Sequence, residues 1–124
     1  MLKRIPATYQ LALMSQITDF HAHVYFSEET LDQATTLCER ARDKFDLRMG
    51  RIHKKPIGPH PVWSCQLSVS VAGFGDIIPW LSTNRDGLTV FIHPNTGDDL
   101  ADHTHHAMWM GQMLPLAVDM FKNR

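Results

Sequence analysis

Apolar and polar residues alternate along the segment Phe20–Phe26, whose sequence is FHAHVYF. Successive side chains of a strand point to opposite faces of a sheet, so this alternation is typical of a strand with one buried face. The apolar residues would face the core, whereas His21, His23 and Tyr25 would share the opposite, polar face. The segment therefore predicts a strand over about 18–26 that carries two imidazoles side by side.

The same kind of pattern predicts the remaining elements. Apolar residues recur every three or four positions after Ser27, which predicts a helix that ends near Phe45. Gly50 is a candidate β-bulge, where an extra residue would turn Arg51 and His53 toward the polar face. The other expected strands are 47–53, 62–70 and 88–93, and the other expected helices are 73–84, 97–105 and 115–122.

The order strand, helix, strand, strand, helix, strand is that of the ferredoxin-like βαββαβ sandwich. Right-handed crossovers place both helices on one face of an antiparallel sheet. The strands would then lie side by side in the order 88–93, 18–26, 62–70 and 47–53. The predicted fold class is α+β, a ferredoxin-like sandwich with a C-terminal helical extension.

The chain has 124 residues, which fits one domain, expected over 14–124. Residues 1–13 are expected to be a dispensable N-terminal extension, because Met14 begins a run that leads directly into the first strand. Two alternatives stand for this extension. It is either a disordered tail or a short helix that packs through Leu11, Leu13 and Ile17.

Charge and cysteine content narrow the class of protein. Lys and Arg number 12 and Asp and Glu number 13, so the chain has no basic field that would attract nucleic acid or an anionic membrane. No apolar run approaches the roughly 20 residues of a membrane span, and the N-terminus lacks a clear secretory cleavage site. Cys38 and Cys65 form no CxxC pair and are expected to be free buried thiols. These features favour a cytoplasmic location.

Histidine is abundant, with eight residues in one small domain. In the expected strand order, the end of 88–93 lies beside the start of 18–26, so His93 would approach His21 and His23. Three imidazoles at such separations can converge on one metal ion. The competing interpretation is that these histidines are solvated or hydrogen-bonded without a metal. A carboxylate from Asp98 or Asp99 would join them only if the loop folds back, and both acids suit a helix N-terminus better.

A second group of polar residues outlines a cleft beside these strands. Arg51, His53 and His60 lie on the strand 47–53 and the proline-rich loop after it, where they could bind a planar, anionic ligand. The competing interpretation is a surface charge for Arg51 and hydrogen-bonded loop structure for the two histidines.

The motifs FHAHVYF, GRIHKKPIGPHPVW, PWLSTNRDGLTVFIHPNTGDDLADH and HAMWMG resemble the DOPA 4,5-dioxygenase family, from about Ile17 to Leu116. The resemblance implies a ferredoxin-like fold, a homodimer, and an extradiol-type activity that cleaves the ring of a catechol such as DOPA with O2. The family's histidine motifs fall here on His21, His23, His53, His60, His93 and His103.

We combine this resemblance with the strand pattern to predict the roles of the residues. The predicted metal ligands are His21, His23 and His93, with Fe(II) as the expected ion and Zn or another divalent metal as the alternative. The predicted catalytic residues are His53, His60 and His103, and the predicted substrate-binding residues are Arg51, Tyr25 and Asn95. Two other classes of protein remain open: a metal-free dimeric module that binds a small molecule, and a zinc enzyme of another reaction class.

Overall fold

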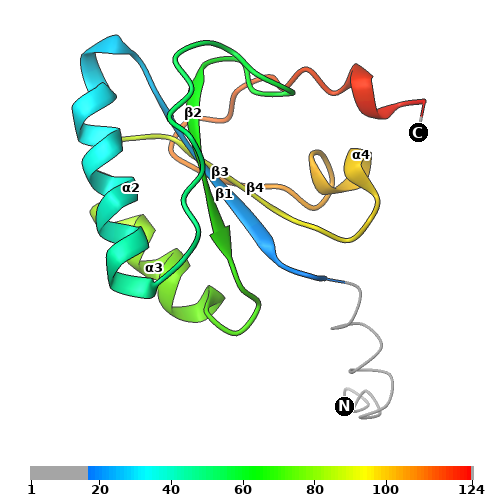
Figure 1. Cartoon of the computed structure of the whole chain (residues 1–124). Coiled ribbons are helices and arrows are strands. Elements are labelled where there is room, and N and C mark those ends of the chain that lie inside the picture. Colours follow the sequence, from blue (N-terminus) through cyan, green and yellow to red (C-terminus); the bar gives the residue numbers. More distant parts are fainter. Residues whose placement is uncertain (1–16, 124) are drawn as a thin grey trace, which may run out of the picture.

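A computed structural model describes residues 17–123 of the chain, so the predicted extension 1–13 lies outside the described residues (Figure 1). The strands are β1 (Phe20–Phe26), β2 (Trp63–Val69), β3 (Val90–Pro94) and β4 (Met108–Met110). The α-helices are α2 (Leu31–Phe45), α3 (Phe74–Asn84) and α4 (Asp99–Asp102), and two 3-10 turns are η1 (Glu28–Thr30) and η2 (Asp119–Phe121).

The strands form one antiparallel sheet in the order β2-β1-β3-β4. Helices α2 and α3 cover one face of this sheet (Figure 1). This arrangement confirms the predicted α+β class, with β3 beside β1 and β1 beside β2. We call the face with α2 and α3 the core face, and the opposite one the histidine face.

The segment 47–53 is not the regular strand that its pattern predicted. It lies at the expected edge, but only two isolated bridges join it to β2, from Met49 to Leu67 and from His53 to Ser64. From the first bridge to the second, the chain advances four positions on this segment, from Met49 to His53, but only three on β2, from Leu67 to Ser64. The segment therefore contains one extra residue, as in a β-bulge. The candidate bulge at Gly50 lies within this interval, and its backbone N–H donates to the carbonyl of Gln66 at 2.7 Å.

The C-terminal region also differs from its prediction. A three-residue strand, β4, extends the sheet beyond β3 where no strand was predicted, and the predicted helix 115–122 is reduced to η2. The backbone N–H of Ala117 donates to the carbonyl of Pro59 at 2.9 Å, so this amide bonds to a distant loop and not to a helix of its own. The C-terminal segment is thereby tied to the histidine face.

The core face buries the apolar set that the alternation predicted. Its central residues have almost no exposed surface, and they pack between the sheet and the two helices; they include Ala22, Val24, Cys65, Leu67, Val90, Ile92, Ala34, Leu37, Cys38, Ala41, Ile77 and Leu81. Both cysteines are free and buried, as predicted. None of the described helices combines the length and the apolar character needed to cross a membrane.

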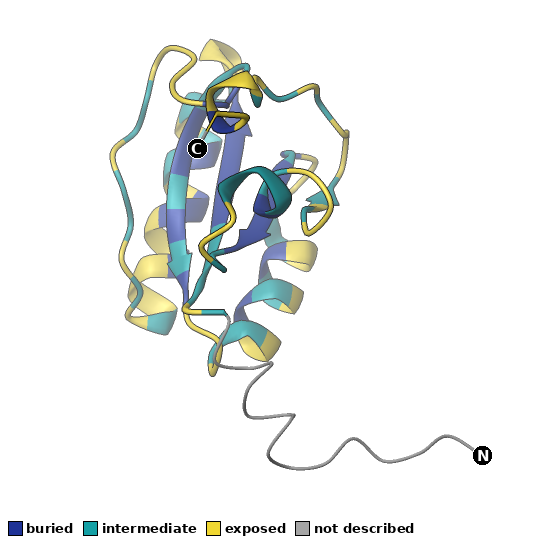
Figure 2. Ribbon diagram, turned by 90° about the vertical axis from the view of Figure 1, so that its right-hand side faces the viewer, coloured by how far each residue is buried: buried dark blue, intermediate teal, exposed yellow. Residues whose placement is uncertain are grey.

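The histidine face is largely covered by its own chain. Figure 2, which looks at this side, shows the strands mostly as buried, with α4 and irregular segments lying over them. Phe91 and Tyr25 are 0% and 3% exposed, and the ring of Trp109 on β4 lies 4.7 Å from that of Phe91. These aromatic side chains are therefore mostly covered within the monomer, and the homodimer stays a prediction.

Candidate functional site

Three histidines meet where β1 and β3 lie side by side. The antiparallel register pairs His21 with His93 and His23 with Phe91, so His93 lies directly opposite His21 and diagonal to His23. One ring nitrogen from each of the three lies within 4.8 Å of the others. The structure therefore brings together the three residues that the sequence predicted as metal ligands.

The shortest contact in this cluster joins Nε2 of His23 to Nε2 of His93, at 3.1 Å. Two nitrogens held about 2.1 Å from one ion at a right angle lie about 3 Å apart, so this separation fits neighbouring ligands of one metal. The Nδ1 atom of His93 lies 2.9 Å from the carbonyl of Pro94, and because a carbonyl only accepts, Nδ1 donates. The lone pair of His93 is then on Nε2, toward His23, as metal-binding histidines are commonly oriented.

Burial keeps these imidazoles neutral. Desolvation, followed by the charges of the neighbouring histidines, lowers the pKa of His23 well below its usual value. Desolvation likewise lowers the pKa of His93 to about 4, and it lowers the pKa of His21 although Asp19 acts in the opposite direction. A neutral imidazole is the form that binds a metal ion. At neutral pH the donor set is therefore ready to bind a divalent cation.

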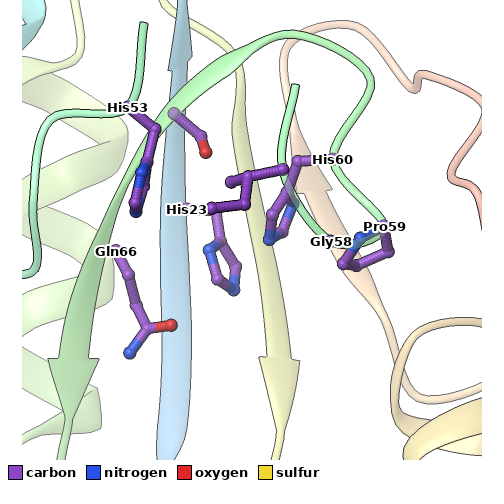
Figure 3. A pocket seen from close by; sticks show the side chains of 8 residues that line it. His23, His53, Gly58, Pro59, His60 and Gln66 are labelled. Atoms are coloured by element: carbon purple, nitrogen blue, oxygen red, sulfur yellow. The ribbon is translucent and has the colours of Figure 1, made fainter. Parts of the chain in front are cut away.

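A cavity of about 200 Å³ adjoins this cluster at His23. Its lining residues come from β1, β2 and the segment before β2: His23, His53, Ile57, Gly58, Pro59, His60, Ser64 and Gln66. Figure 3 shows the imidazoles of His23, His53 and His60 pointing into the same space, with the amide of Gln66 beside them. Two of the three predicted catalytic histidines therefore line this cavity.

The extra residue near Gly50 explains why His53 reaches the cavity. Paired residues of neighbouring strands point to the same face of a sheet. His53 pairs with Ser64, and Ser64 pairs with Tyr25, so all three side chains point to the histidine face. Met49, by contrast, pairs with Leu67 and packs against the core. Without the extra residue, His53 would share the face of Met49 and point to the core.

His60 is fixed by a hydrogen bond with Tyr25. The Tyr25 hydroxyl lies 2.7 Å from Nδ1 of His60, and the two residues are 3% and 8% exposed. Burial raises the pKa of Tyr25, so the hydroxyl stays protonated, and it lowers the pKa of His60 to about 4. When the hydroxyl donates to Nδ1, the proton of the neutral His60 ring resides on Nε2.

His103 approaches the cluster from the end of α4. Its ring centroid lies 4.2 Å from that of His93 and 4.5 Å from that of Phe121, which stacks on its other side. Its Nδ1 donates to the carbonyl of Asp99 at 2.7 Å, so Nε2 of the neutral ring carries the lone pair. Opposite tautomers are thus favoured at His60 and His103.

The three predicted substrate-binding residues do not line the cavity, and their role stays a prediction. Tyr25 is engaged by His60, and the Asn95 amide donates to the Asp19 carboxylate at 2.7 Å. Neither Tyr25, Asn95 nor Arg51 is among the residues that line the cavity, and Arg51 is exposed.

The carboxylates near the site have structural roles. Asp98 caps α4, because its Oδ1 accepts from the backbone N–H of Ala101 at 3.0 Å. Asp102, which the sequence reasoning missed, is 1% exposed and accepts from the backbone N–H and the hydroxyl of Thr96 at 2.8 and 2.7 Å. It also accepts from Nδ1 of His106 at 3.0 Å, and this i,i+4 spacing was the only sequence signal for it. Asp102 therefore holds the loop that carries His103.

Comparisons with known proteins agree with the resemblance noted from the motifs. The sequence pattern that defines the Dopa 4,5-dioxygenase family matches residues 20–120. An uncharacterized 21.2 kDa protein of Botryotinia fuckeliana is 39% identical over 115 residues, which cover 83% of this chain and 63% of that protein. The DOPA 4,5-dioxygenase of Amanita muscaria is 30% identical over 116 residues, which cover 86% of this chain and 51% of that protein. The chain thus spans less than two thirds of the length of either relative.

A solved structure shares the fold. The crystal structure of a "putative dioxygenase" from Nostoc punctiforme PCC 73102 is 35% identical and superposes with a TM-score of 0.78. The match covers 89% of this chain and 96% of that chain. The fold seen here therefore accounts for nearly all of the cyanobacterial chain in that crystal structure.

Proposed function

The chain belongs to the Dopa 4,5-dioxygenase family, and we propose that it is a metal-dependent dioxygenase that opens the ring of a catechol with O2. The observation that carries this proposal is the convergence of His21, His23 and His93 beside a cavity that two further histidines line. A dioxygenase-like enzyme is what the names of the family and of its relatives support. Three parts of the proposal go beyond a dioxygenase-like enzyme and are argued from the residues of this chain. They are the metal, the extradiol position of ring cleavage and the catechol substrate.

The proposed metal site consists of His21, His23 and His93. Their neutral rings suit a divalent ion of the first transition series, and Fe(II) is the ion that fits a reaction with O2. When bound, Fe(II) would bring the catechol and O2 together and allow electrons to pass between them. Among the described residues no carboxylate joins these nitrogens in the candidate cluster, so the proposed site uses imidazoles alone on the protein side.

His103 is the proposed base. Its Nε2 lone pair can accept a proton from a catechol hydroxyl, because Nδ1 is committed to the carbonyl of Asp99. Phe121 stacks on the ring and fixes its plane beside His93. The removal of this proton prepares the catechol for ring opening, and His103 can return the same proton to the ring-opened product.

His60 is proposed to donate a hydrogen bond to the substrate. Its ring centroid lies 4.1 Å from that of His23, and the hydrogen bond with Tyr25 leaves its Nε2 as a donor. A neutral imidazole at this place can hold a substrate oxygen by a hydrogen bond without giving up its proton. Tyr25 would thus act on the reaction through His60. His53, on the opposite wall of the cavity, would hold the substrate or a water molecule by a hydrogen bond.

The test uses protein that is loaded with Fe(II) without oxygen and then mixed with air-saturated buffer and a panel of catechols. The proposal predicts oxygen uptake that depends on both the metal and the catechol, together with a yellow ring-opened product. Metal binding without oxygen uptake would favour a metal enzyme of another reaction, such as a zinc hydrolase. Failure to bind any metal would overturn the proposal and favour a metal-free binding module.

A further inference from the structure

The wall of the cavity comes almost entirely from a part of the sequence that has no acidic residue. Between Asp46 and Asp76 the chain contains no Asp or Glu, although the whole chain has 13 acidic against 12 basic residues. Seven of the eight lining residues lie in this interval, and only His23 lies outside it. The same interval carries four permanent positive charges, on Arg48, Arg51, Lys54 and Lys55. The cavity therefore has a positively charged surrounding in a chain that is nearly neutral.

Three of these cations belong to the segment that borders the cavity. Arg51, Lys54 and Lys55 are exposed, and they lie within two residues of His53, whose ring points into the cavity (Figure 3). None of them forms an ion pair with an acid of the described residues. Their charges are thus available to a bound anion.

Acidic residues on other segments of the described chain line a different groove or are already hydrogen-bonded. Glu28 and Glu29 line a different groove with Pro56 and Pro61, and both are exposed. Asp19 lies beside His21 and accepts from the amide of Asn95, and Asp102 is occupied by Thr96 and His106. Among the described residues that line the cavity, none is acidic. A cationic group in this cavity would therefore find no carboxylate in its walls.

We propose that the preferred substrate is a catechol whose side arm carries a carboxylate and no ammonium group. This inference rests on the proposed function, which supplies the catechol ring. It adds the charge that the side arm of the substrate carries. Ser64 and Gln66 can hydrogen-bond the neutral part of the molecule, while Arg51, Lys54 and Lys55 attract the carboxylate at the mouth. An amino acid such as DOPA adds a positive charge beside these cations and is the poorer ligand.

The test compares four catechols with the same two-carbon arm. These are 3-(3,4-dihydroxyphenyl)propanoate, DOPA, 2-(3,4-dihydroxyphenyl)ethylamine and 4-ethylcatechol, which differ in charged groups and little in the ring. Each is titrated by calorimetry, without oxygen, into protein loaded with Fe(II), so that binding is measured and not turnover. The expected order of affinity is the propanoate first, then DOPA and ethylcatechol, and the amine last. Added salt should lower the affinity for the propanoate and leave the affinity for ethylcatechol almost unchanged.

Substitutions test whether the three named cations cause this order of affinity. Lys54→Gln combined with Lys55→Gln, and separately Arg51→Gln, should each lower the affinity for the propanoate by about fivefold, the usual scale of an exposed charge pair, and leave ethylcatechol unaffected. Arg40→Gln is the matched control, because its guanidinium lies 5.2 Å from the ring centroid of Trp80 on α3, at the helices of the core face. The control should change neither affinity.

The outcomes separate this inference from the proposed function. Equal binding of the propanoate and ethylcatechol, or tighter binding of DOPA, would overturn the charge preference even if oxygen uptake is observed. A preference for the propanoate that disappears in the Lys and Arg variants would support it even if no ring cleavage occurs. If none of the four catechols binds, both proposals are wrong.

Discussion

The Nε2 atoms of His23 and His93 lie 3.1 Å apart, on adjacent strands and with only 4% and 2% of the two residues exposed. Because Nδ1 of His93 donates to the carbonyl of Pro94, its Nε2 faces His23 with a lone pair. Without a metal, His23 must place its own proton between the two nitrogens. With a metal, that proton would have to move to Nδ1 of His23, so that both Nε2 lone pairs bind the ion. The contact thus links metal binding to the tautomer of His23.

The stability of the metal-free protein should fall in acid because of these buried imidazoles. Burial lowers the pKa of His60 and of His93 to about 4, compared with 6.5 in the unfolded chain. Between these values the unfolded state binds more protons than the folded state, so the free energy of unfolding increases with pH and levels off above pH 6.5. We expect each of the two residues to contribute up to about 3 kcal/mol, lost as the pH falls from 6.5 to 4. Urea unfolding at several pH values measures this slope.

His60→Asn provides the control for that measurement. Asn places a polar atom near Nδ1 but does not titrate, so the slope between pH 4 and 6.5 should become shallower. A variant with the slope of the parent would contradict the assignment of His60 as a buried neutral imidazole.

Tyr25→Phe should reduce turnover without loss of metal. The variant removes only the hydroxyl that lies 2.7 Å from Nδ1 of His60, so either ring nitrogen of His60 can then carry the proton. We expect kcat to fall by about 10–100-fold, as for other residues that orient the imidazoles of a metal site, with little change in KM. Imidazole nitrogen NMR on metal-free protein gives an independent measurement, since the parent should hold the proton on Nε2 and the variant should show a mixture.

A double-mutant cycle separates this orienting role from a simple loss of packing. If Tyr25 acts through His60, adding Tyr25→Phe to His60→Asn should cause no further loss of kcat. Losses that add fully would show that Tyr25 contributes independently of His60.

His103→Ala should leave the metal in place and lower turnover by about 10²–10⁴-fold, the range for loss of a general base. The residue stacks between His93 and Phe121 but does not belong to the three-histidine cluster. His103→Gln tests the packing contribution, because it restores bulk without a comparable base. A variant that loses its iron together with its activity would make His103 a ligand.

Much of the fold could be predicted from the periodicity of the sequence. The alternation in Phe20–Phe26 and the helical spacing after Ser27 depend on local geometry, so β1 and α2 were found close to their observed limits. The strand β4 has three residues, too few for an alternation to be recognised. The segment 115–122 has a helical composition, yet Ala117 bonds to Pro59, a tertiary contact that no local pattern contains.

The site could be predicted only where it depends on strand register. His21 and His93 meet because antiparallel neighbours bring the end of one strand beside the start of the other, and the order of elements fixes which strands are neighbours. The hydrogen bond between Tyr25 and His60 depends on the path of the proline-rich loop, which has no periodicity. His53 was placed correctly only because an extra residue near Gly50 was considered.

The most direct measurement for the central claim is the iron content per chain after anaerobic loading of the parent and of His23→Ala, His21→Ala and His105→Ala. The first two variants each remove a predicted ligand, whereas His105 is exposed and outside the cluster. A circular dichroism spectrum and a thermal melt establish that each variant is folded. We predict bound iron in the parent and in His105→Ala, with a strong loss in the other two. A folded His23→Ala protein that holds as much iron as the parent would contradict the three-histidine site.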